Sequence, residues 1–331
     1  MIEKKSISII IPNYNGEGLF REFLPYTLNS IKSSGLEYEI IVVDDCSTDD
    51  SVNFIETYYP DIKLVVNTKN QGFSFSCNRG IEIAKYGLIF LLNSDVKLTE
   101  GYFEPQLKYF QYDDTFGVMG RIIDMEGDGI QDVARMPKFN GFKMKSDFYY
   151  SEDAGDLVYT FYLSGANALI DAKKLKEIGG FNELFSPFYS EDLELSIRAW
   201  RLGWKCYYEH SAVCRHKLSA STNSYKTPQW VKRIYFRNRF YVHAIHLEGI
   251  SLLLWFAQIS LIDFIPKFFT GQFWMLKSYK DFLNNIKYIK QSRKQFKRTQ
   301  ELKNSERSLY DIVSIIKSDA EGKNIHKIAS K

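Results

Sequence analysis

The candidate residues for binding a charged ligand and for moving a proton are five acids and one histidine: Asp44, Asp45, Asp95, Glu191, Asp192 and His216. Carboxylate oxygens are the ligands that Mg²⁺ and Mn²⁺ prefer, and an imidazole nitrogen beside them shifts that preference toward Mn²⁺. A carboxylate can also take the proton of an attacking hydroxyl group. These groups are therefore the candidates for a cation site and for proton transfer.

The elements that must position these residues alternate between strands and helices. Four largely apolar runs are typical of buried parallel strands, the first of them rich in β-branched residues: residues 6–11, 39–43, 62–67 and 88–92. The segments between them favour helices: residues 20–33, a helix start that resembles a capping box at 47–50, and residues 74–85. This alternation predicts an α/β fold with a mostly parallel, doubly wound sheet. Ligands bind such sheets beyond the carboxyl ends of the strands, where Asp45 and Asp95 are expected to lie.

The second half of the chain carries weaker signals. We expect strands at 116–123, 159–163 and 166–170, a loop at 126–129 and a helix at 191–202. From residue 225 onward the composition favours helices. We therefore predict a first domain over residues 1–224 and a C-terminal helical region over residues 225–331.

Charge divides the chain into the same two parts. Residues 1–224 carry a net charge of −9, and residues 225–331 carry a net charge of +12. An acidic body suits a site that handles cations, whereas a basic tail suits a polyanionic surface. The acidic body argues against nucleic acid as the partner.

Other features narrow the class of protein. The four cysteines are far apart and include no C-x-x-C pair, which indicates reduced thiols in the cytoplasm rather than zinc ligands or disulfides. The N-terminal apolar run ends at Pro12 without a small-residue cleavage site, so we expect a first strand and no signal peptide. Neither a G-x-G-x-x-G motif nor a glycine-rich phosphate loop follows that strand, which argues against a dinucleotide oxidoreductase and a nucleotidyltransferase.

Segment by segment, residues 6–221 resemble the family-2 glycosyltransferases of the GT-A fold. The pieces that carry the resemblance are SIIIPNYNG (8–16), VVDDCSTDDS (42–51), NQGFSFSCNRGI (70–81), LLNSDV (91–96), GGFNELFSPFYSEDLELSIRAWRLGW (179–204) and VCRHKLSAS (213–221). Their order and spacing are more specific than any single piece. The pattern is most similar to the rhamnosyltransferase-like and galactofuranosyltransferase-like branch in bacteria. The resemblance implies a GT-A catalytic domain over residues 1–224.

The resemblance also implies an inverting enzyme in which Asp192 is the general base and Glu191 fixes the loop or contacts the acceptor. A position at the start of a helix favours the charged carboxylate, so we expect Asp192 to be ionised near neutral pH. The structural alternative is that both acids only stabilise a helix N-terminus. Glu194 and Arg198 are expected to form an i,i+4 ion pair and no more.

A divalent metal, Mn²⁺ or Mg²⁺, is implied by the same resemblance, with Asp95 and His216 as its protein ligands. The metal motif of the family is usually D-x-D, and here Asn93 and Ser94 precede Asp95, so the first acid is missing. One carboxylate is enough when a second protein ligand, phosphates and water complete the shell. The alternative for His216 is a structural histidine.

Donor binding is expected at the ends of the early strands. By resemblance, Asp45 would accept the N3–H of a uracil or thymine, with Asp44 in support, because an ionised carboxylate only accepts hydrogen bonds. The other residues that the resemblance implies for the donor nucleotide are Pro12, Tyr14, Asn15, Asn70, Gly72, Asn78, Arg79, Asn93 and Ser94. Helix caps and glycine turns are the structural alternatives.

Acceptor binding is expected from two softer signals. Gly165 and Ala166 lie at a strand start, where small residues would let a sugar approach closely. Phe188 and Tyr189 belong to an aromatic-rich loop that could stack on an acceptor sugar. Core packing is the alternative for each of them.

The C-terminal region alternates apolar, aromatic stretches with lysine and arginine. Residues 249–262 form an uncharged run of fourteen, which is shorter than the roughly 20 residues needed to span a bilayer. Apolar helices with basic flanks are typical of elements that lie in the membrane interface. Packing against the catalytic domain, a homodimer interface and a spanning helix remain open as alternatives.

We therefore expect a metal-dependent, inverting glycosyltransferase. It would move a sugar from a UDP- or dTDP-sugar donor to a hydroxyl group of a lipid-linked or cell-surface polysaccharide acceptor. We expect it in the cytoplasm, peripheral on the inner face of the cell membrane. The alternative is a catalytically inactive nucleotide-sugar-binding or scaffold protein that retains the fold, which the missing first acid of the metal motif keeps open.

Overall fold

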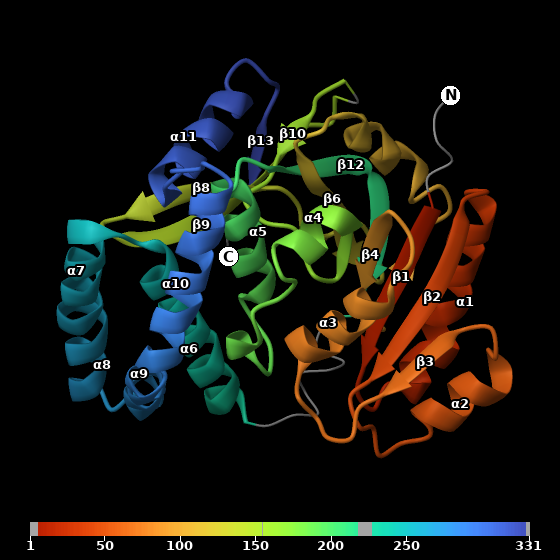
Figure 1. Ribbon diagram of the computed structural model, residues 1–331, viewed down its shortest axis with the longest axis horizontal. Helices are drawn as coiled ribbons and strands as arrows, with labels where there is room; N and C mark the ends of the chain where they lie inside the picture. Colours follow the sequence, from red (N-terminus) through yellow and green to blue (C-terminus); the bar gives the residue numbers. More distant parts are fainter. Residues whose placement is uncertain (1–5, 154, 218–226, 329–331) are drawn as a thin grey trace.

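A ten-stranded sheet forms the core of the right-hand part of the molecule in Figure 1. This computed structural model describes residues 6–153, 155–217 and 227–328. The sheet has the order β10-β12-β6-β11-β4-β1-β2-β3, with β5 paired to β12 and β7 paired to β6. Its strands are β1 (Ser6–Asn13), β2 (Glu37–Asp44), β3 (Lys63–Val66), β4 (Leu88–Leu92), β5 (Val96–Leu98), β6 (Thr115–Asp124), β7 (Ile130–Asp132), β10 (Val158–Tyr159), β11 (Asn167–Asp171) and β12 (Lys205–His216).

The sheet is mostly parallel and doubly wound, as the alternation of strands and helices predicts. The chain moves outward from β1 through β2 to β3, then returns to place β4 on the other side of β1, and all four strands are parallel. Later in the chain, β11 lies between β4 and β6 and is antiparallel to both. The order in which strands are added reverses between β1 and β4, and this opens a crevice at their carboxyl ends, where open α/β sheets bind ligands.

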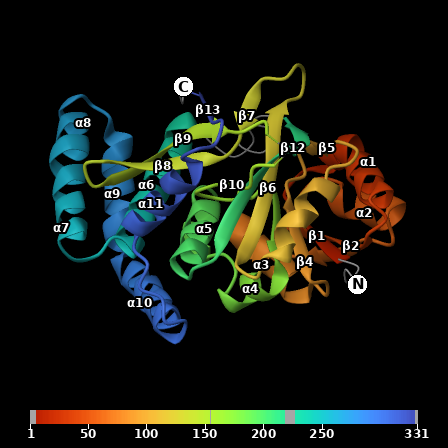
Figure 2. The ribbon, with the colours of Figure 1, turned by 90° about the horizontal axis from the view of Figure 1, so that it is seen from above.

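Helices cover both faces of this sheet (Figure 2). Ile9 packs in one layer with α1 and α2, whereas the next residue, Ile10, packs in the opposite layer with α3. Successive side chains of a strand point to opposite faces, so a strand buried on both faces is a continuous apolar run. The helices of this part are α1 (Glu17–Ser33), α2 (Ser51–Tyr58), α3 (Phe73–Ile83), the 3₁₀ helix η1 (Glu104–Gln111), α4 (Ala172–Glu177), the 3₁₀ helix η2 (Glu183–Phe185) and α5 (Glu191–Arg201).

Two local predictions were wrong. The capping box predicted at 47–50 does not form, and α2 begins only at Ser51, because the Ser47 hydroxyl donates instead to Asp44 (2.6 Å). The strand predicted at 159–163 is reduced to β10, which ends at Tyr159. Beyond it the Phe161 amide donates to the Arg135 carbonyl oxygen, away from the main sheet.

The C-terminal region is mainly helical and also completes a second, three-stranded sheet of order β13-β9-β8, which sequence patterns did not predict. Its last strand comes from the end of the chain and pairs antiparallel with β9. The elements are β8 (Arg135–Asn140), β9 (Lys143–Tyr150), α6 (Pro228–His246), α7 (Gly249–Gln258), the π-helical turn η4 (Ile259–Phe264), α8 (Ile265–Phe269), α9 (Phe273–Asn284), α10 (Ile286–Leu302), α11 (Leu309–Ala320) and β13 (His326–Ile328).

One hydrophobic core joins the C-terminal helices to the sheet. Buried side chains of α6 and α7, such as Phe240 and Trp255, belong to the same cluster as Ile10 and Met119 of the sheet. The domain boundary predicted near residue 224 lies outside the described residues.

The apolar helix of the C-terminal region is longer than the uncharged run of residues 249–262 from which it was predicted. Helical structure runs without a break through the 21 residues Gly249–Phe269. Only 11% of the most apolar 18-residue stretch of this helix is buried inside the protein. Asp263 does not end it, because its carboxylate pairs with Lys143 of β9 (2.8 Å). Among the described residues this is the one helix long and apolar enough to cross a membrane, by length and composition only.

Candidate active site

A cavity of about 430 Å³ lies at the crevice where the strand order reverses. Its volume is in the usual range for small-molecule sites, about 300–1,000 Å³. Fourteen of the predicted site residues line it: Pro12, Tyr14, Asp45, Gly72, Asn93, Ser94, Asp95, Gly165, Ala166, Phe188, Tyr189, Glu191, Asp192 and His216. Predicted donor, metal, catalytic and acceptor residues therefore face one space.

Asp192 lies on this cavity at the start of α5. Its Oδ1 accepts the backbone N–H of Leu193 (2.7 Å), and its Oδ2 lies 3.4 Å from the N–H of Gly165. The two residues before α5, Tyr189 and Ser190, have φ angles of 78° and 67°. This backbone conformation costs energy in residues other than glycine and is typical of functional sites.

Burial raises the pKa of Asp192 to about 6, although the N–H groups of Leu193 and Gly165 favour its charged form. Burial, and then the neighbouring Asp192, raise the pKa of Glu191 well above its usual value. This shift is opposite in direction to the one that a helix start alone would give. A helix dipole contributes about 0.3–1 kcal/mol, less than one pKa unit, whereas burial can shift a carboxyl group by several units. Near pH 7.5 Asp192 is still ionised, as expected.

Glu191 is buried beside its neighbour. Its Oε2 has no hydrogen-bond partner among the described residues, an arrangement that is costly for a buried polar atom. Further along α5, Glu194 and Arg198 form the predicted i,i+4 ion pair (2.9 Å), and Arg198 also donates to the carbonyl oxygen of Ile178. That ion pair is structural, as expected.

Asp95 and His216 face each other across the cavity wall, with 3.3 Å between Asp95 Oδ1 and His216 Nε2. The His216 tautomer follows from its other neighbour. Gln131 uses its amide nitrogen to donate to Asp124 Oδ1 and to the His216 carbonyl oxygen, so its Oε1 accepts Nδ1–H of His216 at 2.9 Å. The Nε2 atom then carries a lone pair directed at the carboxylate.

This pair fits a divalent cation. Two acceptor atoms 3.3 Å apart repel each other unless a proton or a cation is shared between them, and a ring whose other N–H is held by a second residue is a typical metal-binding histidine. Among the described residues no group of three or more His, Cys, Asp or Glu could hold a metal. Phosphate or water ligands would have to complete the coordination shell.

Asp45 is already engaged by its own chain. Its Oδ1 accepts from Asn67 Nδ2 (2.8 Å), and its Oδ2 accepts the N–H of Gly72 (2.7 Å), while the N–H of Gln71 lies 3.0 Å from both oxygens. These bonds bring the turn before α3 to the cavity. A base that donates to Asp45 would have to share or replace one of them.

Gly72 at the start of α3 cannot carry a side chain in this conformation. Its φ angle is 90°, and a Cβ atom would lie 2.7 Å from the backbone of Pro187. The next amide, that of Phe73, donates to the Pro187 carbonyl oxygen (2.9 Å). The donor-side turn and the loop before α5 are therefore in direct contact.

Five predicted donor residues do not line the cavity: Asn15, Asp44, Asn70, Asn78 and Arg79. Asp44 accepts from Asn13 (2.9 Å), and Asn15 accepts the Thr48 amide (2.7 Å), so these side chains hold the loops after β1 and β2 together. Asn78 instead caps the segment before η2, where it donates to the Phe181 carbonyl oxygen. Arg79 and Asn70 are exposed.

Further residues line the cavity that were not among the predicted site residues: Asn13, Phe73, Ser76, Ser164 and Pro187. The buried Oδ1 of Asn13 has no hydrogen-bond partner among the described residues and is therefore available to a ligand. A polar residue directly after a buried strand is the signal that could have identified it.

Asn238 of α6 is a positioning residue that the sequence did not indicate. It is fully buried, and its Nδ2 donates to the carbonyl oxygens of Phe185 (2.6 Å), Phe188 (3.0 Å) and Tyr189 (2.8 Å). This one amide group holds the loop that leads into Glu191. Nothing in the local sequence around Asn238 marks it, because its partners lie about 50 positions away.

The fold and the cavity are typical of enzymes that bind a ligand where the strand order of a doubly wound sheet reverses. A buried carboxylate, that of Asp192, lies on the wall of the same cavity. Residues 8–179 match the family model described as Glycosyl transferase family 2. This match covers more than half of the chain. The protein belongs to glycosyl transferase family 2 and is a glycosyltransferase, as the sequence motifs indicate.

Curated relatives agree with this family. One is an uncharacterized glycosyltransferase of Haemophilus influenzae, 26% identical over 245 residues, which cover 70% of this chain and 88% of the relative. Another is the poly(ribitol-phosphate) β-N-acetylglucosaminyltransferase TarP of Staphylococcus aureus, 31% identical over 129 residues, which are 38% of each chain. This chain thus spans less than half of TarP.

The fold is of the GT-A type. The crystal structure of GalNAc-T7 with UDP, GalNAc and Mn²⁺ superposes with a TM-score of 0.65 and 13% sequence identity, over 98% of this chain and 59% of that chain. This likeness concerns the fold. The C-terminal helical region follows the GT-A domain in the same chain.

Proposed function

We propose that this glycosyltransferase transfers a sugar, with inversion, from a UDP- or dTDP-sugar to a hydroxyl group of a lipid-linked or cell-surface polysaccharide acceptor. The single observation that supports the proposal is that one cavity of about 430 Å³ is lined by Asp45, Asp95, His216 and Asp192. A pyrimidine nucleotide, its diphosphate and the reacting sugar need these groups at one site. The similarity to TarP and to a structure that contains UDP is consistent with such a donor.

Donor binding would begin at the ends of β1 and β2. Asp45 would accept the N3–H of the base, with Pro12 and Tyr14 beside it on the cavity wall. Gly72 lets the backbone come close to the ligand at the start of α3. Asn13 would add an acceptor through its buried Oδ1.

Asp95 and His216 would hold Mn²⁺ or Mg²⁺ at the diphosphate, with Asn93 replacing the first acid of the usual motif. When bound, the cation neutralises the charge that develops on the leaving diphosphate. The imidazole ligand favours Mn²⁺. Gln131 contributes by holding the His216 ring with Nε2 toward Asp95.

Asp192 would accept the proton of the acceptor hydroxyl while that oxygen attacks the anomeric carbon. A pKa of about 6 suits this role, because the carboxylate is ionised at neutral pH yet more basic than an exposed aspartate. Glu191, whose pKa is raised by burial and by the neighbouring Asp192, would fix the loop or contact the acceptor. Gly165, Ala166, Phe188 and Tyr189 would form the acceptor side of the cavity.

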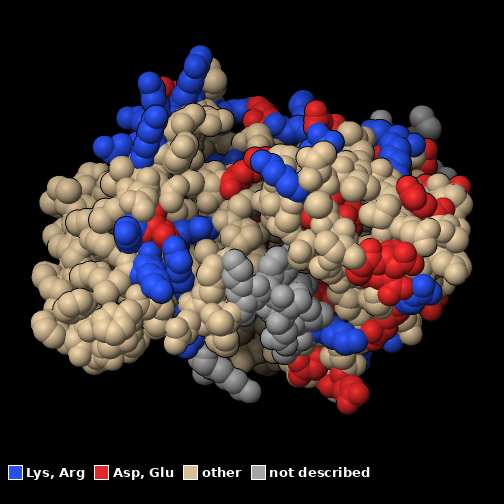
Figure 3. All heavy atoms as spheres, turned by 90° about the horizontal axis from the view of Figure 1, so that it is seen from below, with Lys and Arg blue, Asp and Glu red and all other residues tan. Residues whose placement is uncertain are grey.

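The C-terminal helices would hold the enzyme on the inner face of the cell membrane as a cytoplasmic, peripheral protein. Large apolar side chains of the Gly249–Phe269 helix are exposed, among them Ile250 and Leu253 (66% each) and Phe269 (80%). Figure 3 shows this end of the molecule as a broad surface without charged side chains, with lysine and arginine along its edge. An exposed apolar face with basic flanks fits an anionic lipid surface. A homodimer formed through the same face is the competing interpretation.

The experiment that tests the proposal is incubation of the full chain with a panel of nucleotide sugars and Mn²⁺, followed by measurement of nucleotide release and of donor-dependent thermal shifts. Release of UDP or dTDP from at least one donor, dependent on the metal, is the expected result. Donor binding without release from any donor or acceptor would favour the inactive binding protein that the missing first acid keeps open.

A further inference from the structure

A second cavity, of about 320 Å³, lies between the first turns of α6 and α9, apart from the active site. Aromatic side chains and two cations line it, namely Trp230, Trp274, Phe273, Arg233 and Lys277. None of the described residues that line it is acidic. A pocket with aromatic walls and positive charge suits an anion that is attached to an apolar or amphiphilic body.

The two cations differ in their surroundings. Arg233 donates from Nη2 and Nε to both oxygens of Asp281 (2.7 and 2.5 Å), and Ser278 Oγ donates to the Arg233 carbonyl oxygen (3.0 Å). These bonds join α6 to α9 and hold the guanidinium group in place, but Asp281 balances its charge. Lys277, which is exposed one turn into α9, is therefore the cation that gives the cavity its net positive charge.

The cavity borders the exposed apolar helix. Phe273, on its wall, is 58% exposed, and Phe269, at the end of the Gly249–Phe269 helix, is 80% exposed. In Figure 1 the end of α8 and the start of α9 lie together at the same end of the molecule. A ligand with an anionic head in the cavity could thus extend an apolar chain toward the exposed apolar side chains of this helix.

The cavity also borders the active site. The Trp230 ring meets the Phe188 ring edge to face, with 5.7 Å between centroids, and Phe188 lines the active-site cavity. The Trp230 and Phe188 rings are therefore a point of contact between the walls of the two cavities. A head group bound beside Trp230 would lie next to a wall of the active-site cavity.

We propose that this second cavity binds the phosphate group of a lipid-linked acceptor, whose hydrocarbon chain lies along the Gly249–Phe269 helix and whose sugar passes Phe188 to reach Asp192. This inference rests on the proposed function, since it specifies where the lipid-linked acceptor is held. It assigns a role to Lys277 and Trp230, which the donor and metal sites do not use.

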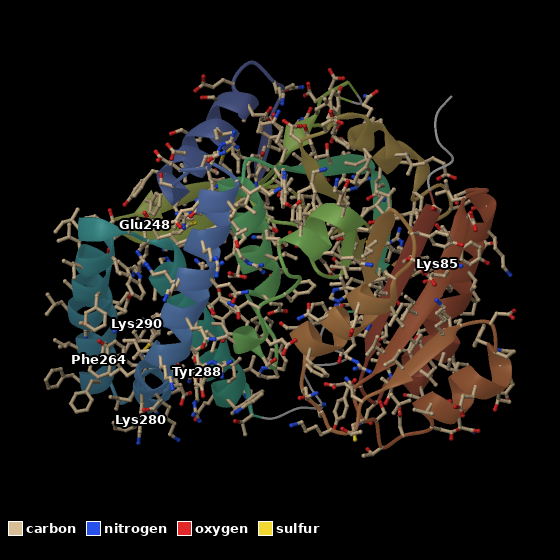
Figure 4. All side chains as sticks on the ribbon, in the orientation of Figure 1. Lys85, Glu248, Phe264, Lys280, Tyr288 and Lys290 are labelled. Atoms are coloured by element: carbon tan, nitrogen blue, oxygen red, sulfur yellow. The ribbon has the colours of Figure 1, made fainter. Side chains whose placement is uncertain are left out.

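The test is vesicle flotation of the full chain with three lipid compositions. Phosphatidylcholine vesicles carry a few per cent of a polyprenyl phosphate, the same amount of the corresponding polyprenol, or phosphatidylglycerol at equal charge. The variants are Lys277→Gln, Lys277→Arg and Lys290→Gln, a matched charge removal on α10 outside the cavity (Figure 4). The expected result is retention on the polyprenyl phosphate vesicles, weakened roughly fivefold by Lys277→Gln, restored by Lys277→Arg and unchanged by Lys290→Gln.

Three outcomes would overturn the inference. Equal retention on polyprenol vesicles would mean that only the hydrocarbon chain is recognised. Equal weakening by Lys277→Gln and Lys290→Gln would mean a general basic surface, and equal retention on phosphatidylglycerol would make bilayer phospholipid the ligand. Nucleotide release is measured separately with the wild-type chain, so a failure of the proposed transfer reaction is distinguished from a failure of phosphate binding.

Discussion

The two walls of the active-site cavity are held in place in different ways. On the donor wall, Asp45 is bound by Asn67 and by the turn at Gly72, all within 27 positions of it. On the catalytic wall, the loop before Glu191 is held by Asn238, about 50 positions away on α6. The first wall is built from neighbouring strand ends of the sheet, whereas the second needs the C-terminal helices. The C-terminal helices therefore support the active-site loop and are not only a candidate membrane contact.

The largest expected effect is on the catalytic wall itself. Asp192→Asn removes the proton acceptor but keeps the shape, so transfer should fall by about a thousandfold, within the usual range for a general base. The donor dissociation constant should remain within a few fold, because the donor wall is untouched. Product formation and donor titration measure the two quantities. The wild-type rate should also decline below about pH 6, where Asp192 takes up a proton.

Asp171→Asn is a matched control for this variant, since Asp171 begins α4 and accepts the Lys174 amide away from the cavity. It should leave transfer nearly unchanged. Transfer by Asp192→Asn at the wild-type rate would show that the base has been assigned to the wrong residue.

The donor wall is tested by Asp95→Asn. Loss of the carboxylate should lower transfer by roughly a hundredfold, since the cation supplies several kcal/mol of charge stabilisation, and should abolish the thermal shift caused by Mn²⁺. Activity and thermal shift are measured over a Mn²⁺ titration. Asp128→Asn is the control, because that side chain is 89% exposed and pairs with Arg215, away from the Asp95–His216 pair. A Mn²⁺ shift that persists in Asp95→Asn would contradict the metal assignment.

A smaller effect should show whether the catalytic wall can be disturbed without changing the donor wall. Asn238→Ala removes a buried amide that donates to three carbonyl oxygens, so the loop before Asp192 should lose its fixed position. We expect kcat to fall about tenfold with acceptor, while donor affinity stays the same. Asn285→Ala, which removes one bond to the Asp281 carbonyl oxygen, controls for a general loss of helix packing. Equal loss of donor affinity and kcat would mean that Asn238 only supports the fold.

The smallest effect concerns stability. The pKa of Glu191 is raised in the folded protein, so ionisation of this group destabilises the folded state. This destabilisation is complete above the folded-state pKa and absent below the pKa of the unfolded chain. Glu191→Gln should therefore raise the melting temperature by a few degrees at pH 8 and leave it unchanged near pH 4. Thermal denaturation across this range measures the difference, with the exposed Glu100→Gln as control. A gain that is equal at both pH values would contradict a raised pKa of Glu191.

Much of the donor wall could be predicted from the sequence. Polar and aromatic residues within three positions of the end of a buried strand lie near the edge of the sheet, and parallel strands bring such residues together, as Tyr14, Asp45 and Asp95 do here. The prediction failed for Asn15, in the loop after β1, and for the exposed Arg79 of α3. Side chains in loops and on helices can point either to the cavity or to a neighbouring backbone, and only the loop conformation decides between them.

The sequence by itself determined the alternation of strands and helices, the family and the chemical groups at the strand ends, because these depend on local periodicity and on residues close in the chain. The tertiary structure alone decided that Asp192 is buried enough for its pKa to rise to about 6. It also decided that α6 supplies Asn238 to the catalytic loop and that a second cavity meets the first at Trp230 and Phe188. Burial and contacts of this kind arise between segments far apart in the chain, and no local pattern encodes the distance between them.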